Sequence, residues 1–321
     1  MHPITDPQLA AGLAGLERAL PDGIALDDIP AIRKKMDDLR ATMATQAPAI
    51  AGVDSSDHQA PGLDEAPAVM VRLYRPETRP VLLPALLWIH GGGYVLGSVQ
   101  ATDLQAKTMA HALGCVVASV EYRLAPEHPF PAALHDCYAA LTWLMRTASQ
   151  LGIDHSRIAI GGASAGGGLA AGLALLARDR GELPVRYQLL LYPMLDDSNI
   201  RQAGSDVPDT PVWTRASNLA AWRAYLQQEP GSDGISEYAA PIRARDVGGL
   251  PPTYMGVGTT DLFRDENIAY AQRLMRAGVP TELHVYADAF HGFDGFAADS
   301  DAAQRFTAEH TRLLSRALHE E

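Results

Sequence analysis

The spacing of apolar residues divides the chain into two parts. Within residues 1–50, leucines and other apolar side chains recur at helical spacing on both sides of the turn signal PDG at residues 21–23, which predicts two helices. After residue 68 the pattern changes to short apolar runs that are typical of buried strands. These runs predict strands over residues 68–74, 81–89, 115–122, 157–162, 187–193, 253–258 and 282–287.

Helical segments lie between these strands. The pattern predicts helices over residues 102–113, 132–151 and 265–277 and a further helix that begins after Ser164. His310 and His319 lie on a polar, helical stretch near the end of the chain, where we expect both to be solvated. Nearly continuous apolar strands that alternate with helices indicate a mostly parallel sheet with both faces covered, so the fold class is α/β.

The alternation is interrupted between residues 195 and 247, where Trp213, Trp222 and Tyr225 stand among prolines and acidic residues. We interpret this stretch as an insertion above the sheet. The expected organisation is a helical part over residues 1–50, a core in two parts over residues 51–194 and 248–321, and the insertion over residues 195–247.

Composition narrows the classes of partner. The 321 residues are 47% hydrophobic, and 26 basic residues stand against 38 acidic ones without any basic cluster, so nucleic acid is not an expected partner. No stretch reaches the ~18 apolar residues of a membrane span, and no signal-peptide pattern is seen, so the default location is cytoplasmic. Cys115 and Cys137 lack the spacing of zinc or redox sites and are expected to be core residues, so we expect no metal or cofactor.

The segment GGASAGGGLA surrounds Ser164 with small residues directly after an apolar run. It contains the pattern G-x-S-x-G and opens an alanine-rich helix, which is the strand–turn–helix setting of a nucleophilic serine. A phosphate-binding loop is disfavoured, because no lysine follows the glycines and the G-x-G-x-x-G pattern is absent. Glycines that serve only close packing stay an alternative on this segment alone.

A second glycine-rich segment, LLWIHGGGYVLGS, also follows a predicted strand and precedes the serine. Successive glycines allow backbone N–H groups to turn toward a ligand, which forms an oxyanion hole without side chains. A plain glycine-rich turn is the alternative. The two segments nevertheless occur in the chain order that an acyl-transfer site of this type requires.

A serine nucleophile needs a base to accept its proton and a carboxylate to orient that base. On an α/β sheet the acid and then the histidine follow the serine, on loops after later strands. His291 in DAFHGF is the favoured base, whereas His284 lies within a strand and is expected to be packed or paired. Asp261 in GVGTTDLFRDE is the favoured acid, and Asp288 competes with it because it lies only three residues from His291.

Five segments, HGGGY, YRLAPEHPFPAAL, GASAGG, DLFRDE and FHGF, together resemble the hormone-sensitive lipase-like esterases of the α/β-hydrolase superfamily. The resemblance runs from about residue 81 to the C-terminus. It implies that Ser164, Asp261 and His291 form a catalytic triad. It also implies that the backbone of Gly92, Gly93 and Ala165 forms the oxyanion hole.

The same resemblance implies that residues 1–50 and the insertion form a cap over the pocket. Prolines and Arg123 in YRLAPEHPFPAAL are expected to brace a loop beneath the site. Ala163 departs from the family, in which Asp or Thr usually precedes the serine, so a polar brace is missing at that position.

We therefore expect a cofactor-independent serine carboxylesterase that acts on small, short- to medium-chain esters through an acyl-enzyme. The candidate pocket residues are Tyr94, Met36, Leu39, Trp213, Trp222 and Tyr225. A lactone, amide or carbamate substrate is one alternative. Another is a ligand receptor, as in the plant gibberellin receptors, which resemble this family but lack the histidine that this chain keeps. The oligomeric state, monomer or homodimer, stays open.

Overall fold

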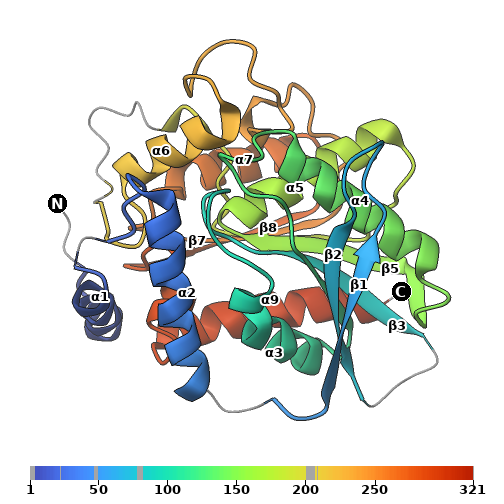
Figure 1. Cartoon of the computed structure of the whole chain (residues 1–321), viewed down its shortest axis with the longest axis horizontal. Helices are drawn as coiled ribbons and strands as arrows, with labels where there is room; N and C mark the ends of the chain where they lie inside the picture. Colours follow the sequence, from blue (N-terminus) through green and yellow to red (C-terminus); the bar gives the residue numbers. More distant parts are fainter. Residues whose placement is uncertain are drawn as a thin grey trace.

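The computed structural model describes residues 4–21, 23–46, 50–77, 82–199, 207 and 209–320, with the side chains of residues 40–46 excepted. In this part of the chain eight strands form one sheet in the order β1-β2-β4-β3-β5-β6-β7-β8 (Figure 1). The strands are β1 (Val53–Ala60), β2 (Val69–Pro76), β3 (Leu83–Ile89), β4 (Val116–Val120), β5 (Ile153–Ala163), β6 (Gln188–Leu191), β7 (Thr253–Gly258) and β8 (Thr281–Tyr286). β2 is antiparallel to both of its neighbours, and all the other pairs are parallel.

The central strands owe their position to their composition. Every residue of β3, β4, β6 and β7 is buried, as a sheet covered on both faces requires. β1 is different, because its sequence VDSSDHQA is mostly exposed and lies at the edge of the sheet. This strand was not predicted from apolar spacing, since it joins the sheet through backbone pairing with β2 and buries little side-chain surface.

Helices cover both faces of the sheet. α3 (Asp103–Leu113) and α9 (Asp301–His319) lie on one face, and α4 (Ala132–Thr147), α5 (Ala165–Arg180) and α7 (Arg264–Arg276) lie on the other (Figure 1). The remaining helical elements are α1 (Pro7–Ala19), α2 (Ile29–Gln46), η1 (Gln100–Thr102), α6 (Arg215–Leu226), η3 (Pro241–Arg243) and α8 (Phe293–Phe296). The α/β fold class is confirmed, and so are the two helices within residues 1–50. None of the helices in the described part of the chain is both long and apolar enough to cross a membrane.

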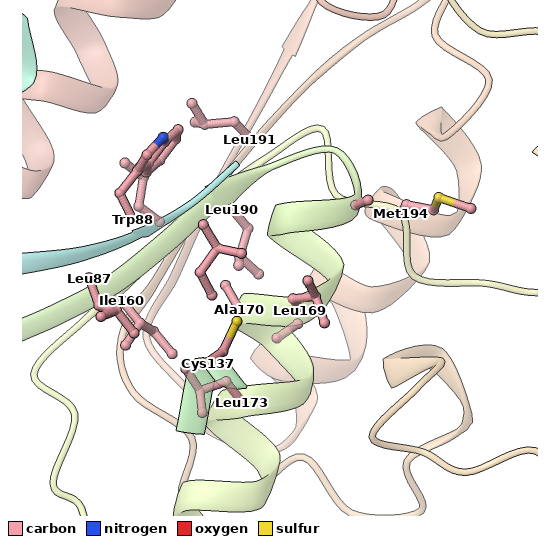
Figure 2. Packing of buried hydrophobic residues seen from close by; sticks show 14 of the residues in the cluster. Leu87, Trp88, Cys137, Ile160, Leu169, Ala170, Leu173, Leu190, Leu191 and Met194 are labelled. Carbon is pink, nitrogen blue, oxygen red and sulfur yellow. The ribbon is translucent and has the colours of Figure 1, made fainter. Parts of the chain in front are cut away.

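The core between the sheet and α5 is built from aliphatic side chains (Figure 2). Leu87 and Ile160 of the sheet lie over Leu173 of the helix, and all three are buried. Cys137 projects into the same cluster, and both it and Cys115 are free and fully buried. The prediction that the cysteines are core residues is confirmed.

Two histidines outside the active-site motifs, His310 and His284, are not fully exposed to solvent. His310 is only 7% exposed, so the expectation that it is solvated is wrong. Burial lowers the pKa of His310 to about 4. His284 is half-buried and its Nδ1 lies 2.8 Å from Glu309 Oε2, which confirms that it is paired. His319 is exposed, as expected.

Candidate active site

Ser164 occupies the sharp turn between β5 and α5. Its backbone has φ +58° and ψ −123°, a conformation that costs a non-glycine residue of the order of 1–3 kcal/mol. The turn is held because the Ser164 N–H donates to Leu191 O at 2.9 Å and the Ser164 carbonyl accepts from Met194 N at 3.0 Å. The neighbouring strand β6 and the residues after it therefore maintain the strain, which is the arrangement of a nucleophile elbow.

The small residues after the serine allow α5 to approach the sheet closely. A Cβ atom placed on Gly166 would lie 2.1 Å from the carbonyl oxygen of Ile89, a distance that no side chain tolerates. Close packing and a nucleophile turn are thus both present in this segment.

The structure brings Ser164, His291 and Asp261 together. His291 Nε2 lies 2.9 Å from Ser164 Oγ, and His291 Nδ1 lies 2.9 Å from Asp261 Oδ2. Asp261 is fully buried, His291 is 5% exposed and Ser164 is 9% exposed. A carboxylate at Nδ1 orients the imidazole so that Nε2 faces the hydroxyl, which is the geometry needed to accept the serine proton.

Topology explains why the acid and the histidine meet. Asp261 follows β7 and His291 follows β8, and these strands are parallel neighbours, so their carboxyl-end loops lie side by side. The second carboxylate oxygen of Asp261 accepts the Phe263 N–H at 2.8 Å. The loop itself therefore orients the carboxylate, independently of the hydrogen bond to His291.

Asp288, the competing acid, has different partners. Its Oδ2 accepts the N–H groups of Thr5 at 2.9 Å and Asp6 at 3.0 Å, and also the Thr5 hydroxyl. Asp288 therefore ties the start of the described chain to the histidine loop, and Asp261 is the carboxylate that contacts His291.

The glycine-rich loop after β3 presents backbone N–H groups near the serine. Gly92 has φ +127° and Gly93 has φ +60°, and the Gly92 carbonyl accepts the N–H groups of Val95 and Leu96. Within the described residues, the N–H groups of Gly92, Gly93 and Ala165 donate to no other backbone or side-chain group. These three donors, two on the loop and one at the start of α5, are available for an anion.

Trp213 of the insertion lies directly against this loop. A Cβ atom on Gly93 would stand 2.2 Å from Trp213 Cη2 and 3.3 Å from Ala221 Cβ. The indole Nε1 donates to Asn218 Oδ1 at 3.2 Å, which holds the ring in place. The insertion therefore covers the candidate oxyanion loop.

Three of the six candidate pocket residues pack with one another. Tyr94 stacks on Tyr225 with ring centroids 4.0 Å apart, and Trp222 lies 5.4 Å from Tyr94. All three are at most 1% exposed and form an aromatic cluster between the glycine-rich loop and α6, and their role in a substrate pocket stays a prediction. Met36 and Trp213 are also largely buried and Leu39 is half-buried, so a pocket role for these three stays a prediction.

The YRLAPEHPFPAAL segment is held by two arginines. Arg123 makes a bidentate contact with the buried carboxylate of Asp136, with Nη2 at 2.7 Å from Oδ1 and Nε at 2.9 Å from Oδ2. Arg33 of α2 makes a second bidentate contact with Glu127, at 2.7 and 2.9 Å. These hydrogen bonds lower the pKa of Glu127 to about 2.

Arg33 also reaches the residues around the glycine-rich loop. Its Nε donates to Val95 O at 2.8 Å and its Nη2 donates to Ala125 O at 2.9 Å. One side chain from the N-terminal helical part thus connects α2 with both motif-bearing loops.

Sequence reasoning missed the roles of three further side chains. Glu266 of α7 is buried, its Oε1 accepts the N–H groups of Leu195 and Asp196, and burial raises its pKa well above the usual value. Tyr192 and Asp294 lie next to His291 and bond to each other at 2.7 Å. Spacing in the sequence carries no signal for this pair, because 102 positions separate its members.

Comparison with known proteins adds to this geometry. A family model described as alpha/beta hydrolase fold matches residues 86–295. The carboxylesterase NlhH of Mycobacterium tuberculosis is 40% identical over 268 residues, which cover 80% of this chain and 81% of the relative. The ethyl acetate hydrolase of Pseudomonas putida is 35% identical over 230 residues, 70% of each chain. Among solved structures, a bacterial heroin esterase aligns over 98% of both chains with 43% identity and a TM-score of 0.92.

Fold and site together define an α/β hydrolase. Within that superfamily, the chain belongs to the hormone-sensitive lipase-like esterases. It is a carboxylic ester hydrolase, like the relatives to which it is similar.

Proposed function

We propose that this chain hydrolyses small, short- to medium-chain carboxylic esters through an acyl-enzyme on Ser164. The observation that carries the proposal is the continuous line of hydrogen bonds from Asp261 through His291 to Ser164, with 2.9 Å at each step. All three groups are buried or nearly so, which strengthens the electrostatic contact between the carboxylate and a protonated imidazole.

In the acylation step, Ser164 Oγ attacks the ester carbonyl carbon while His291 Nε2 accepts the hydroxyl proton. The N–H groups of Gly92, Gly93 and Ala165 receive the oxyanion, and each donor of this kind is worth about 2.7–4 kcal/mol in the transition state. The tetrahedral intermediate collapses when His291 returns the proton to the leaving alcohol. Asp261 stays ionised and stabilises the imidazolium throughout.

In the deacylation step, a water molecule takes the place of the alcohol. His291 accepts a proton from the water as it attacks the acyl carbon, and the same N–H groups receive the second oxyanion. Collapse releases the carboxylic acid and returns the proton to Ser164. No redox group or metal enters this scheme.

The substrate class is supported by the packing around the oxyanion loop. Trp213 lies against Gly93, which limits the space on that side of the serine and favours a short acyl chain. Two relatives, the ethyl acetate hydrolase of Pseudomonas putida and the arylesterase of Saccharolobus solfataricus, carry names that agree with small acyl groups and with aromatic alcohols. A series of p-nitrophenyl esters from acetate to palmitate measures the chain-length limit.

The direct test compares two serine variants. Ser164→Ala is expected to keep the fold and to lose nearly all turnover of p-nitrophenyl acetate. Ser156→Ala is the matched control, because it removes an exposed hydroxyl from β5, the strand that leads to Ser164. Turnover by Ser164→Ala at the level of the control contradicts the proposal.

Three broader expectations belong to this proposal. Cys115 and Cys137 are free thiols, which suits the reducing environment of the cytoplasm, and cell fractionation tests that location. A homodimer is the expected alternative to a monomer, and light scattering after size-exclusion chromatography distinguishes them. The N-terminal part and the insertion are proposed to act as a cap, since both contact the glycine-rich loop.

A further inference from the structure

Two aromatic rings surround the imidazole of His291. The Tyr192 ring lies 4.9 Å from it at an interplanar angle of 70°, and the Phe263 ring lies 4.9 Å from it at 88°. The hydrogen bonds to Asp261 and Ser164 fix the line along which the imidazole lies. Packing against the two rings is what opposes a tilt of the imidazole about that line.

Tyr192 is itself held by several independent contacts. Its backbone has φ +37°, and its N–H donates to Gly256 O at 2.7 Å. Its ring stacks on Phe306 of α9 with centroids 5.9 Å apart. Its hydroxyl donates to Asp294 Oδ1 at 2.7 Å. A non-glycine residue keeps a positive φ only where its surroundings impose it, so the position of this ring is strongly determined.

Asp294 lies on α8, three residues after His291, and is half-buried. Burial raises the pKa of Asp294, while the Tyr192 hydroxyl, the N–H groups of Asp294 and Gly295 and the positive charge of His291 act in the opposite direction. Because the interaction between two charges is mutual, a negative charge on Asp294 stabilises a positive charge on the His291 ring.

We propose that Tyr192 and Asp294 are a positioning pair for His291: the tyrosine ring fixes the tilt of the imidazole, and the carboxylate holds the tyrosine and favours the imidazolium formed in each half-reaction. This inference rests on the proposed function, because it requires His291 to be the base. It also assigns a reason for two features that the triad does not use, the strained backbone of Tyr192 and a partly buried carboxylate that interacts with His291.

The test uses two variants of the pair and two matched controls. Tyr192→Phe keeps the ring but removes its anchor, and Asp294→Asn removes the charge at nearly constant volume. Tyr254→Phe is the control for a buried tyrosine hydroxyl, since its partner is Tyr286. Asp299→Asn is the control for charge, since it removes an exposed carboxylate from the same segment.

The readout is kcat and KM for p-nitrophenyl acetate across pH 5–9. Tyr192→Phe is expected to lower kcat by about 3- to 10-fold, the usual effect of one lost hydrogen bond, with KM changed less than about twofold. Asp294→Asn is expected to move the acid limb of the profile to lower pH, because the variant removes the negative charge that interacts with His291. The two controls are expected to keep the wild-type kcat and pH profile, as a general loss of stability does not move that limb.

Ser164→Ala, measured in parallel, separates the two levels of failure. If Ser164→Ala keeps turnover, the proposed function is wrong. If Ser164→Ala is inactive while Tyr192→Phe and Asp294→Asn both match the wild type in kcat and pH profile, the positioning pair is overturned and the function stands. If Asp294→Asn does not fold, kcat and KM of Tyr192→Phe decide the question.

Discussion

Replacement of Gly93 by alanine tests the link between the glycine-rich loop and the insertion. The new Cβ would stand 2.2 Å from Trp213 Cη2, about 1.3 Å short of the contact distance between two carbon atoms. The backbone at Gly93 also has φ +60°, a conformation that costs an alanine about 1–2 kcal/mol. Either the loop or the indole must therefore move.

The expected loss of kcat follows from the role of the glycine-rich loop as a donor of hydrogen bonds to the oxyanion. A shift of the loop by about 1 Å takes the Gly92 and Gly93 N–H groups out of hydrogen-bond range of the oxyanion, and the loss of one such donor lowers kcat by about 10²- to 10³-fold. The strain at φ is a separate effect on stability. We therefore expect Gly93→Ala to lose at least about 100-fold in kcat while it keeps a cooperative fold.

The assay measures kcat for p-nitrophenyl acetate together with thermal unfolding. Gly114→Ala is the matched control, because Gly114 has φ +58° and a Cβ there would meet no atom within 4 Å, so it carries the same strain without the clash. The double variant Gly93→Ala/Trp213→Ala removes the clash and is expected to recover part of the lost kcat. If Gly93→Ala keeps kcat within about threefold of the wild type, the loop does not bind the oxyanion and the reasoning is refuted.

Three further predictions concern the triad acid Asp261, the buried His310 and the ion pair of Arg33 with Glu127. Asp261→Asn is expected to lower kcat by about 10⁴-fold, whereas Asp288→Asn keeps kcat because its carboxylate contacts the N-terminal segment; equal losses would contradict this assignment. Burial lowers the pKa of His310 from its ordinary 6.5 to about 4, so the free energy of unfolding decreases as the pH is lowered from 6.5 to 4. His310→Leu should abolish up to about 3 kcal/mol of that decrease, measured by urea unfolding at pH 7 and pH 4. The hydrogen bonds from Arg33 lower the pKa of Glu127 from its ordinary 4.5 to about 2, so the stabilisation that this pair gives the fold is present above pH 4.5 and is lost as the pH falls toward 2. Arg33→Met should therefore flatten the dependence of the unfolding free energy on pH between 4.5 and 2. An unchanged dependence would show that the pair contributes nothing.

The central fold could be predicted because its strands are apolar along their whole length. β3, β4, β6 and β7 bury every residue, so each gives a clear signal in the sequence. β1 gives none, because an edge strand that faces water needs only its backbone to pair. His310 was misjudged for a different reason: it lies four residues after Phe306 and three before Leu313, on the buried face of α9, and a count of helical positions would have placed it there.

Only the site residues that lie in recognisable sequence motifs could be predicted. Ser164, Asp261 and His291 each follow a recognisable strand, and parallel topology then brings their loops to one edge of the sheet. The aromatic cluster and the pair of Tyr192 and Asp294 depend on how separate elements pack, and nothing in local spacing records that.

Covalent labelling of the serine tests the central claim most directly. Wild type and His291→Ala are treated with a fluorophosphonate probe, and the adduct is located by peptide mass spectrometry. The account predicts a single adduct on Ser164 in the wild type and labelling slower by at least about 100-fold in His291→Ala, because the hydroxyl then lacks its base. An adduct on a different residue, or equal labelling of the two proteins, would contradict it.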